Sequence, residues 1–297
     1  VEGGIPCKAL RRAARRWVRE HQMEVDVFEL SAQASHRMTP EELHTITGGT
    51  GVLPEATVLV IRDWGTLIGG RSHARTTDAL AELHYDTTKP GERGSLGKVV
   101  TSHARHSTRL QPGVELVATE EHRRKGFASI SDLNKLPDVK TMLRFLEAEF
   151  GIELPVVRVL RYFDPATCGI GWHGDSERDV NVLIRYGVAP ETLPIHYNWF
   201  HRHSPVGRVR RVPMREGQVM IVSKTALGTN FRESSKPTVR HAVGVKQTER
   251  KPDAETRAAL LAAKKARKRA REEAQARDTI GEDPGEYEYD TFMTGAE

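Results

Sequence analysis

The chain has 297 residues, of which 38% are hydrophobic and 29% are charged, and its formal net charge is +5. That length is enough for one large domain or two small ones, and no run of about 18 apolar residues offers a membrane span. With only two cysteines, Cys7 and Cys168, the sequence excludes a disulfide framework and a cysteine-based zinc site. From the few cysteines and the lack of an apolar leader we expect a reducing compartment, cytoplasmic or nuclear, and not secretion.

The first hundred residues predict a mixture of helix, strand and loop. Residues 9–22 carry apolar side chains at helical spacing, and those expected to face a core are Leu10, Ala14, Trp17 and Val18. Residues 57–62 contain a short apolar run that predicts a strand. Residues 86–97, "DTTKPGERGSLG", are polar and contain glycine and proline, so they predict a loop.

A second helix is predicted within "LNKLPDVKTMLRFLEAEFG". Asp138 is placed to cap its N-terminus, and Gly151 is placed to end it. Its apolar face is expected to consist of Val139, Met142, Leu143 and Leu146.

From residue 153 to residue 250 the pattern changes to short apolar segments separated by turn residues. The segments are "ELPVVRVLRYF", "RDVNVLIRYG", "LPIHYNWF", "GRVRRVP", "GQVMIVS" and "VRHAVGVKQ". Each is rich in Val, Ile, Tyr or Phe, which favours strands, and no helix of useful length interrupts them. This spacing predicts an antiparallel sandwich or a jelly-roll barrel.

After Pro252 the pattern changes again, and "AETRAALLAAKKARKRAREEAQARD" predicts one long, mostly polar helix. Over residues 264–277, seven basic residues against Glu272 and Glu273 give a local charge of 7 − 2 = +5. The seven are Lys264, Lys265, Arg267, Lys268, Arg269, Arg271 and Arg277. Such a helix suits contact with a phosphate backbone, and a solvated helix explains it equally well. The acidic end, "GEDPGEYEYDTFMTGAE", predicts disorder.

The segment "GWHGDSERDV", residues 171–180, places His173 and Asp175 one residue apart. Residues i and i+2 of an extended segment point to the same side, so this pair could supply two ligands to one metal ion. A non-haem Fe(II) site uses two histidines and one carboxylate on one face of an octahedron. His241, in the strand candidate "TVRHAVGV", is the expected third ligand.

The same His-x-Asp spacing occurs at His84 and Asp86. In a chain with 13 histidines, about one accidental match is expected. The copy at His84 follows the helical stretch "TDALAEL" and leads into the polar loop, so no strand context surrounds it. We therefore interpret this copy as the accident and the copy at 173–175 as the metal site. The plain alternative for 173–175 is a polar loop.

Around residues 173–175 the sequence resembles the AlkB-like branch of the Fe(II)/2-oxoglutarate-dependent dioxygenases. The similarity runs from about residue 97 to about residue 250, and its first part is "LPDVKTMLRFLEAEFGIELPVVRVLRYFDPATCGIGWHGDSERD". This part is similar to the family's helix, a strand ending in Arg-Tyr, a turn with glycine, and His-x-Asp followed by an acidic stretch. The later "PMREGQVMIVSKTALGTNFRESSKPTVRHAVG" is similar to the family's turn glycine, apolar strand, loop and distal histidine.

The resemblance implies a role for each matching residue. His173, Asp175 and His241 would hold Fe(II) and form the catalytic centre, and Tyr162 would contact the co-substrate 2-oxoglutarate. Trp172 is an aromatic residue that could stack on a base. The residues expected to face the substrate are Trp172, Glu177, Arg178 and Asp179.

Two departures from the family pattern concern the binding of 2-oxoglutarate. Leu160 stands two residues before Tyr162, where the family usually has Asn, and the Arg-x-Asn-x-Thr-x-Arg signature after the distal histidine is missing. The distal carboxylate of 2-oxoglutarate still needs a cation, ideally a guanidinium that binds both oxygens. Arg250, nine residues after His241, is the first candidate and Lys246 the second; either could instead be a charge at a strand end. These departures place the chain in a divergent group, of viral or protist type.

The resemblance also implies a fold and a domain organisation. The expected class is α+β, with a double-stranded β-helix (jelly-roll) core, an N-terminal α/β extension and flanking helices. Residues 1–96 would form the extension packed on the core, and residues 97–251 the dioxygenase core. Residues 252–281 would form the basic helix, and residues 282–297 the disordered tail.

The implied activity consumes 2-oxoglutarate and O2, releases succinate, and hydroxylates a C–H bond; an N-methyl group would then leave as formaldehyde. A modified base in nucleic acid, DNA or RNA, is the expected substrate, because basic stretches such as "RVRR" and "EHRRK" accompany the acidic segment. The alternative is a 2-oxoglutarate-dependent hydroxylase of protein side chains or of a small molecule. A third hypothesis is a jelly-roll binding module with a vestigial site. We infer no membrane association and no obligate protein partner.

Overall fold

The computed structural model describes residues 4–35, 38–65, 73–93, 99–101, 105–164, 168–187, 193–233 and 235–244. The chain divides into two compact units, residues 1–249 and residues 250–297, and the second unit lies outside the described residues. The predicted basic helix and acidic tail therefore also lie outside them. In the part of the chain that is described, no helix is both long and apolar enough to cross a membrane.

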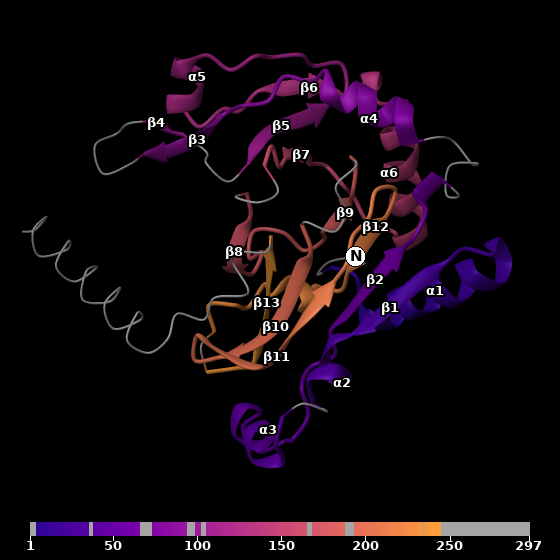
Figure 1. Cartoon of the computed structure of the whole chain (residues 1–297), viewed down its shortest axis with the longest axis vertical. Coiled ribbons are helices and arrows are strands. Elements are labelled where there is room, and N and C mark those ends of the chain that lie inside the picture. Colours follow the sequence, from indigo (N-terminus) through magenta and orange to yellow (C-terminus); the bar gives the residue numbers. More distant parts are fainter. Residues whose placement is uncertain are drawn as a thin grey trace, which may run out of the picture. The chain divides into compact units, whose positions relative to one another are not determined.

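The first unit mixes helices and strands throughout (Figure 1). Its first half contains α1 (Cys7–His21), β1 (Val25–Glu29), α2 (Leu30–Ser35), α3 (Pro40–Ile46), β2 (Thr57–Ile61), α4 (His73–Ala81), β3 (Thr88–Arg93), β4 (Val99–Thr101), β5 (His106–Gln111), α5 (Glu120–Arg124) and β6 (Ile130–Asp132). Its second half contains the 3-10 helix η2 (Leu133–Lys135), α6 (Pro137–Phe150), β7 (Val157–Arg161), β8 (Ile170–His173), β9 (Val182–Ile184), β10 (Ile195–His201), β11 (Ser204–Val212), β12 (Val219–Val222), α7 (Lys224–Leu227) and β13 (Thr238–Val243). The fold is α+β and rich in antiparallel strands.

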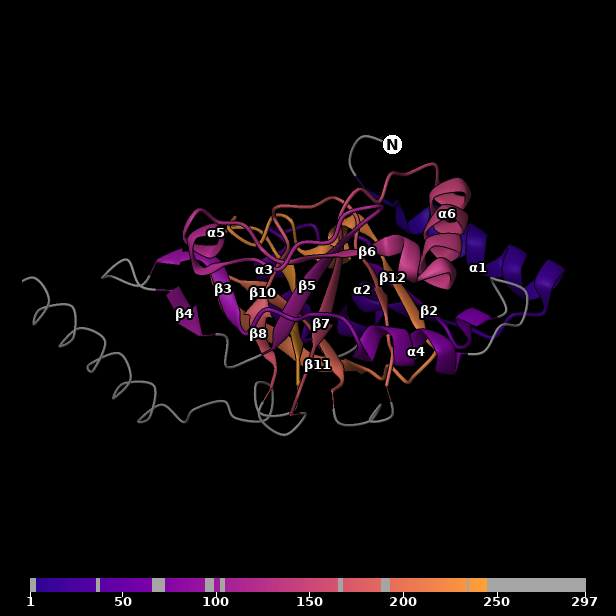
Figure 2. The same cartoon turned by 90° about the horizontal axis from the view of Figure 1, so that it is seen from above.

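Two four-stranded antiparallel sheets form the centre of this unit. The first sheet has the order β1-β2-β12-β9, and the second has the order β11-β10-β13-β8. Strands far apart in sequence thus lie side by side, as where Ile61 of β2 opposes Val219 of β12. Two smaller sheets are formed by β3-β4 and by β6-β5-β7. Figure 2 shows β5, β6 and β7 from above, together with α4 and α6.

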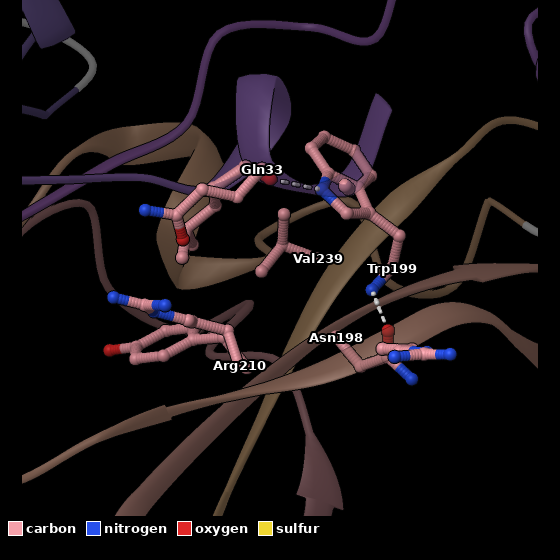
Figure 3. A pocket seen from close by; sticks show the side chains of 9 residues that line it. Gln33, Asn198, Trp199, Arg210 and Val239 are labelled. Carbon is pink, nitrogen blue, oxygen red and sulfur yellow. Dashed lines mark hydrogen bonds between the residues drawn. The ribbon is translucent and has the colours of Figure 1, made fainter. Parts of the chain in front are cut away.

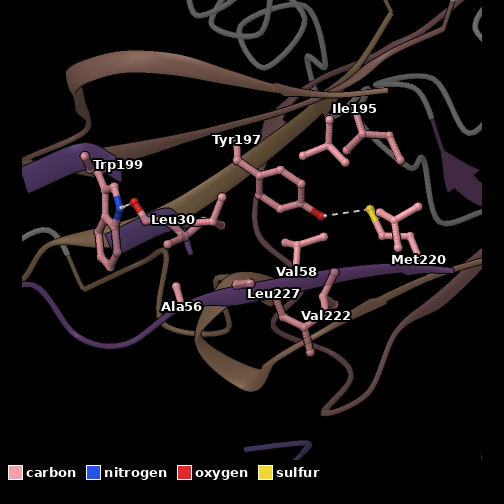
Figure 4. Close-up of a cluster of buried hydrophobic side chains, with 14 of the residues drawn as sticks. Leu30, Ala56, Val58, Ile195, Tyr197, Trp199, Met220, Val222 and Leu227 are labelled. Atoms are coloured by element: carbon pink, nitrogen blue, oxygen red, sulfur yellow. Dashed lines mark hydrogen bonds between the residues drawn. The ribbon is translucent and has the colours of Figure 1, made fainter. Parts of the chain in front are cut away.

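Side chains alternate along β2 between two separate cores. Val58 and Val60 pack in a core shared with Tyr197 of β10, which belongs to the facing sheet (Figure 4). Leu59 and Ile61 point the other way and pack against α1 and α6. Because both faces of this strand are covered, all five of its residues are buried, which explains the unbroken apolar run.

Helices α1 and α6 cover the outer face of the first sheet. Trp17 of α1 is fully buried, and its ring lies 6.0 Å from the ring of Phe145 and 5.9 Å from that of Phe150. Met142 and Leu146 of α6 pack in the same core. A third core joins α4, η2 and α6 to the β6-β5-β7 sheet, so this smaller sheet is tied to the same helices.

Most elements agree with the sequence prediction. The helix expected at 9–22 is α1, and the strand expected at 57–62 is β2. Each of the six apolar segments after residue 153 contains one strand: β7, β9, β10, β11, β12 or β13. Residues 1–96, expected as an extension, contribute β1 and β2 to the same sheet as β9 and β12.

Two local predictions were wrong at the surface. Val18 is 51% exposed, because the buried stripe of α1 is centred on Leu10 and Trp17 and a neighbouring residue lies about 100° round the helix. The stretch 86–97, expected as a loop, contains β3, which pairs with β4. Backbone pairing between two strands does not require apolar side chains, so the polar composition gave no sign of it.

The predicted cap of α6 was also wrong. The helix begins with Pro137, and Leu136 at the N-cap offers no side-chain hydrogen bond. Asp138 lies instead inside the first turn, where its buried carboxylate accepts a hydrogen bond of 3.3 Å from the Thr76 hydroxyl of α4. Gly151, with φ of 62°, ends the helix as predicted.

Candidate metal centre

The two histidines of the predicted site lie side by side on neighbouring strands. His173 is the last residue of β8, and it stands opposite His241 of β13 in the antiparallel register. Their ring centroids are 4.3 Å apart. Asp175 follows two residues later, and its two carboxylate oxygens lie 3.8 Å from His173 Nε2 and 3.6 Å from His241 Nε2. One ligand atom from each residue lies within 4.8 Å of the others, so the structure brings the three together.

Glycine at the middle position of His-Gly-Asp is required by a close backbone approach. A Cβ added at Gly174 would overlap the carbonyl oxygen of Gly228 and lie 2.8 Å from Phe231 Cβ. Gly228 ends α7 with φ of 69°, and a Cβ there would overlap the carbonyl oxygen of Val239 in β13. The end of α7 thus fits between β13 and the turn after β8. The backbone N–H of Asp175 donates to Leu227 O at 3.0 Å, which holds the carboxylate beside the histidines.

Hydrogen bonds orient two of the three side chains. His173 Nδ1 lies 2.7 Å from Gly171 O; an N–H donor there leaves Nε2 with its lone pair free for a metal ion. Asn181 donates its side-chain N–H to Asp175 Oδ2 at 3.0 Å. His241 Nδ1 is buried with no hydrogen-bond partner in the described part of the chain.

Burial sets the charge of the site. It is the main cause that lowers the pKa of His241 to about 3, with further lowering by His173 and Arg178, so this ring is neutral at physiological pH. Burial also raises the pKa of Asp175, against the opposing effects of Arg178 and His173. A buried carboxylate is costly unless positive charge compensates it, and here Arg178 lies 3.8 Å away. A divalent metal ion would compensate that charge.

These residues fit the two-histidine, one-carboxylate donor set of non-haem Fe(II). Bonds of about 2.1 Å to nitrogen and oxygen place neighbouring ligand atoms of an octahedron about 3 Å apart. The observed separations of 3.6 Å and 3.8 Å therefore need only a small contraction. His173, Asp175 and His241 could hold the metal, and the remaining coordination positions would be left for other ligands.

The residues expected to bind 2-oxoglutarate are only partly described. Tyr162, just after β7, is half-buried and packs against the core between the two four-stranded sheets. Burial raises the pKa of Tyr162, and the cations of Arg105 and Arg185 act in the opposite direction. Arg250 and Lys246 lie outside the described residues.

The four residues expected to face the substrate lie in different places. Trp172 precedes His173 on β8, and alternation along the strand points it to the opposite face, where its ring packs 5.5 Å from that of Phe200. Glu177, Arg178 and Asp179 are exposed on the loop that follows Asp175. Arg178 lies 3.8 Å from the Asp175 carboxylate and 2.6 Å from that of Glu177. This loop thus borders the triad, whereas Trp172 does not face it.

The second His-x-Asp copy has a structural explanation. Asp86 is buried and accepts hydrogen bonds of 2.7 Å from both the backbone N–H and the hydroxyl of Ser129. Arg123 adds an ion pair at 3.3 Å, while His84 Nε2 lies 4.0 Å away. Among the described residues, the triad is the group whose ligand atoms could hold a metal ion. The interpretation of the His84 copy as accidental agrees with this arrangement.

The described cavities lie elsewhere. A cavity of about 10 Å³ lies between α2 and strands β10 and β11, lined in part by Gln33, Trp199 and Arg210 (Figure 3). That is room for about one water molecule. A shallow groove of about 400 Å³ carries the ion pair between Arg11 and Glu29. Neither contains the triad, so the site is identified by its converging ligand atoms.

Sequence reasoning missed several residues that matter here. Gly174 and Gly228 act through a backbone approach that only the fold reveals. Asn181 follows Asp175 by six residues and carries no motif. Arg185, just after β9, belongs to no motif, and its place in the fold follows from the pairing of β9 with β12.

Comparison with known proteins adds one relative. No protein-family model matches the chain. The chain is similar to "Uncharacterized protein R156" of Acanthamoeba polyphaga mimivirus, with 36% identity over 114 residues. That match covers 38% of this chain and 43% of the mimivirus protein, so the chain spans less than half of that relative's length. The relative's name states no activity, and the function is argued from the site.

Proposed function

We propose that the protein is an Fe(II)- and 2-oxoglutarate-dependent dioxygenase that acts on nucleic acid. The observation that carries the proposal is the convergence of His173, Asp175 and His241 within 4.8 Å. Two imidazoles and one carboxylate on one side of a metal ion leave several coordination positions open, which suits a metal that must bind a co-substrate and oxygen.

We further propose that the two four-stranded sheets are the halves of a jelly roll. In support, the chain passes repeatedly between them: β8 lies in the second sheet, β9 in the first, β10 and β11 in the second, β12 in the first and β13 in the second. His241 faces the core between the sheets, because it opposes the buried Tyr197 in register with β10. The predicted double-stranded β-helix would place the metal at this position, between the layers.

The chain's own residues would bind and orient the reactants. When bound, Fe(II) with 2-oxoglutarate and O2 would supply oxidation of a substrate C–H bond to C–OH, with release of succinate and carbon dioxide. His173 and His241 would act as neutral ligands, and Asp175 as the anionic one. Asn181 and the Gly174–Gly228 contact would keep the carboxylate in place. The core around Tyr197 would exclude water from the inner side of the centre.

A group of arginines beside the triad supports a polyanionic substrate. Arg109 of β5 and Arg158 of β7 stand directly opposite each other across the sheet, and both are exposed. Burial of part of the guanidinium is the main cause that lowers the pKa of Arg158, and repulsion by the like charges of Arg109, Arg178 and Arg105 lowers it further. Arg178 also contacts Asp175. Phosphate groups of a nucleic acid would relieve this repulsion at the edge of the site.

Succinate formation tests the chemistry. Purified protein is loaded anaerobically with Fe(II) and 2-oxoglutarate, oxygen is admitted, and succinate is quantified with and without methylated DNA and RNA oligonucleotides. His173→Ala is the test variant. His84→Ala, which removes the histidine of the other His-x-Asp pair, is the matched control. We expect succinate from wild type and His84→Ala, increased by one class of oligonucleotide, and none from His173→Ala.

Other results would change the proposal. Succinate that depends on His173 but ignores every oligonucleotide would keep the dioxygenase and exclude the nucleic-acid substrate. Equal Mn(II) binding by wild type and His173→Ala would refute the metal centre itself. For the arginines, an Arg109→Gln/Arg158→Gln protein should bind oligonucleotide with a log–log salt slope smaller by about 1.4 to 1.8. Arg19→Gln, on the exposed face of α1, is the control for that measurement.

A further inference from the structure

Arg185 is a cation in the interior of the fold. It follows β9, and its backbone continues the pairing with β12: Arg185 N donates to Gln218 O, and Gly217 N donates to Arg185 O, both at 3.0 Å. Leu183, two residues earlier, packs in the core between the two four-stranded sheets. Alternation along the strand therefore points Arg185 into the same space.

The guanidinium of Arg185 has no acidic partner in the described part of the chain. Its Nη2 donates a hydrogen bond of 2.9 Å to the carbonyl oxygen of Leu193, which is itself buried in the core. Burial lowers the pKa of Arg185, while Tyr162 acts in the opposite direction. A partly buried guanidinium whose side-chain hydrogen bond among the described residues goes to one carbonyl still offers most of its donors. Such a residue suits an anion that arrives from outside the chain.

The position of Arg185 relates it to the metal centre. Leu193, its hydrogen-bond acceptor, leads into β10, where Tyr197 opposes His241 in register. Four residues of extended chain separate Leu193 from Tyr197, about 13 Å. Tyr162 packs against the same core, and the positive charge of Arg185 acts to lower the pKa of its hydroxyl. The side chains of Arg185 and His241, together with a short dicarboxylate held at the metal site by its keto-acid end, would be long enough to span the distance from Leu193 to Tyr197.

We propose that Arg185, and neither Arg250 nor Lys246, binds the distal carboxylate of 2-oxoglutarate, with the Tyr162 hydroxyl as a second donor. This inference rests on the proposed function, since it concerns the co-substrate of that same site. The planar guanidinium offers two parallel N–H donors to the two oxygens. It replaces the arginine signature that the sequence lacks after His241. The cation thus comes from the sheet that faces the metal-binding strands.

Equilibrium binding without turnover tests the assignment. Mn(II)-loaded protein is titrated anaerobically, by calorimetry, with 2-oxoglutarate and with 2-oxopentanoate, which has the same carbon chain without the distal carboxylate. We expect wild type to prefer 2-oxoglutarate by at least tenfold. Arg185→Gln should lose that preference while its affinity for 2-oxopentanoate stays within about twofold of wild type. Arg185→Lys should restore part of the preference, and Arg250→Gln should keep all of it.

The outcomes separate this inference from the proposed function. If wild type binds Mn(II) but neither keto acid, or binds no Mn(II), both fail. If wild type prefers 2-oxoglutarate and Arg185→Gln does too, only the assignment of Arg185 fails, and loss of preference in Arg250→Gln would name its replacement. Retained affinity for 2-oxopentanoate in Arg185→Gln shows that the variant is folded and that its metal is in place.

Discussion

Substitution of Gly174 tests whether a backbone contact holds the candidate metal ligands in place. In Gly174→Ala every ligand remains, but the new Cβ would overlap Gly228 O and lie 2.8 Å from Phe231 Cβ and 2.9 Å from Gly228 C. The end of α7 must therefore move by about 1 Å, and such overpacking costs about 1–3 kcal/mol. The movement also strains the hydrogen bond from Asp175 N to Leu227 O, worth about 1 kcal/mol.

We expect Gly174→Ala to lower the free energy of unfolding in urea by about 2–4 kcal/mol and to weaken Mn(II) binding by about 10- to 100-fold. Gly113→Ala is the matched control, because Gly113 has φ of 71° and no atom within 4 Å of an added Cβ. The control measures backbone strain without a clash, about 1–2 kcal/mol, and should bind Mn(II) normally. The reasoning is refuted if Gly174→Ala binds Mn(II) as wild type does and loses no more stability than Gly113→Ala.

Three further predictions concern stability. Asp86→Asn should lower the free energy of unfolding by about 2–3 kcal/mol, since Ser129 and Arg123 lose a buried carboxylate as their partner. The Mn(II) affinity should stay unchanged. Weaker metal binding would contradict our interpretation of the His84–Asp86 pair as accidental. Burial lowers the pKa of His196 to about 4, so the unfolded state binds a proton more readily than the folded state. The free energy of unfolding should therefore fall by at most about 3 kcal/mol as pH drops from about 6.5 to about 4. Chemical denaturation at several pH values should show a flatter profile for His196→Gln. Trp17→Ala should lower the free energy of unfolding, measured in urea, by about 3–5 kcal/mol, because Trp17 is fully buried. Val18→Ala, at the exposed neighbouring residue, should change it by less than about 0.5 kcal/mol. Similar losses in both variants would refute the assigned burial.

The sequence predicted those strands and helices whose own residues carry a clear hydrophobic pattern. β2 and β12 are short apolar runs, β10 is rich in Ile, Tyr, Trp and Phe, and each is a buried strand. β8 was harder to recognise, because "GIGWHG" has glycine at three of its six positions and little strand propensity. It becomes a strand through its pairing with β13, which is distant in sequence. The sheet partners of β2 were likewise outside the reach of local patterns.

The candidate site divides in the same way. His173 and Asp175 could be named from their spacing, and His241 from its strand context. Arg185 could not be named, because its burial depends on the register of β9 with β12 and on the core that the facing sheet completes. Trp172 was expected to face the substrate because it adjoins His173 in sequence. In β8, however, neighbouring side chains point to opposite faces, so Trp172 lies on the face away from His173 and packs against Phe200.

The pairing of β2 with β12 affects how the chain can fold during synthesis. β2 leaves the ribosome long before β12 exists, and until then it has an unpaired edge and apolar side chains on both faces. An exposed apolar edge strand is prone to join other chains. β1, with acidic residues Asp26 and Glu29, can pair with it early and shield one edge. Cutting the protein at residue 96, to isolate residues 97–251, would leave β12 with the opposite defect, a bare edge where β2 should be.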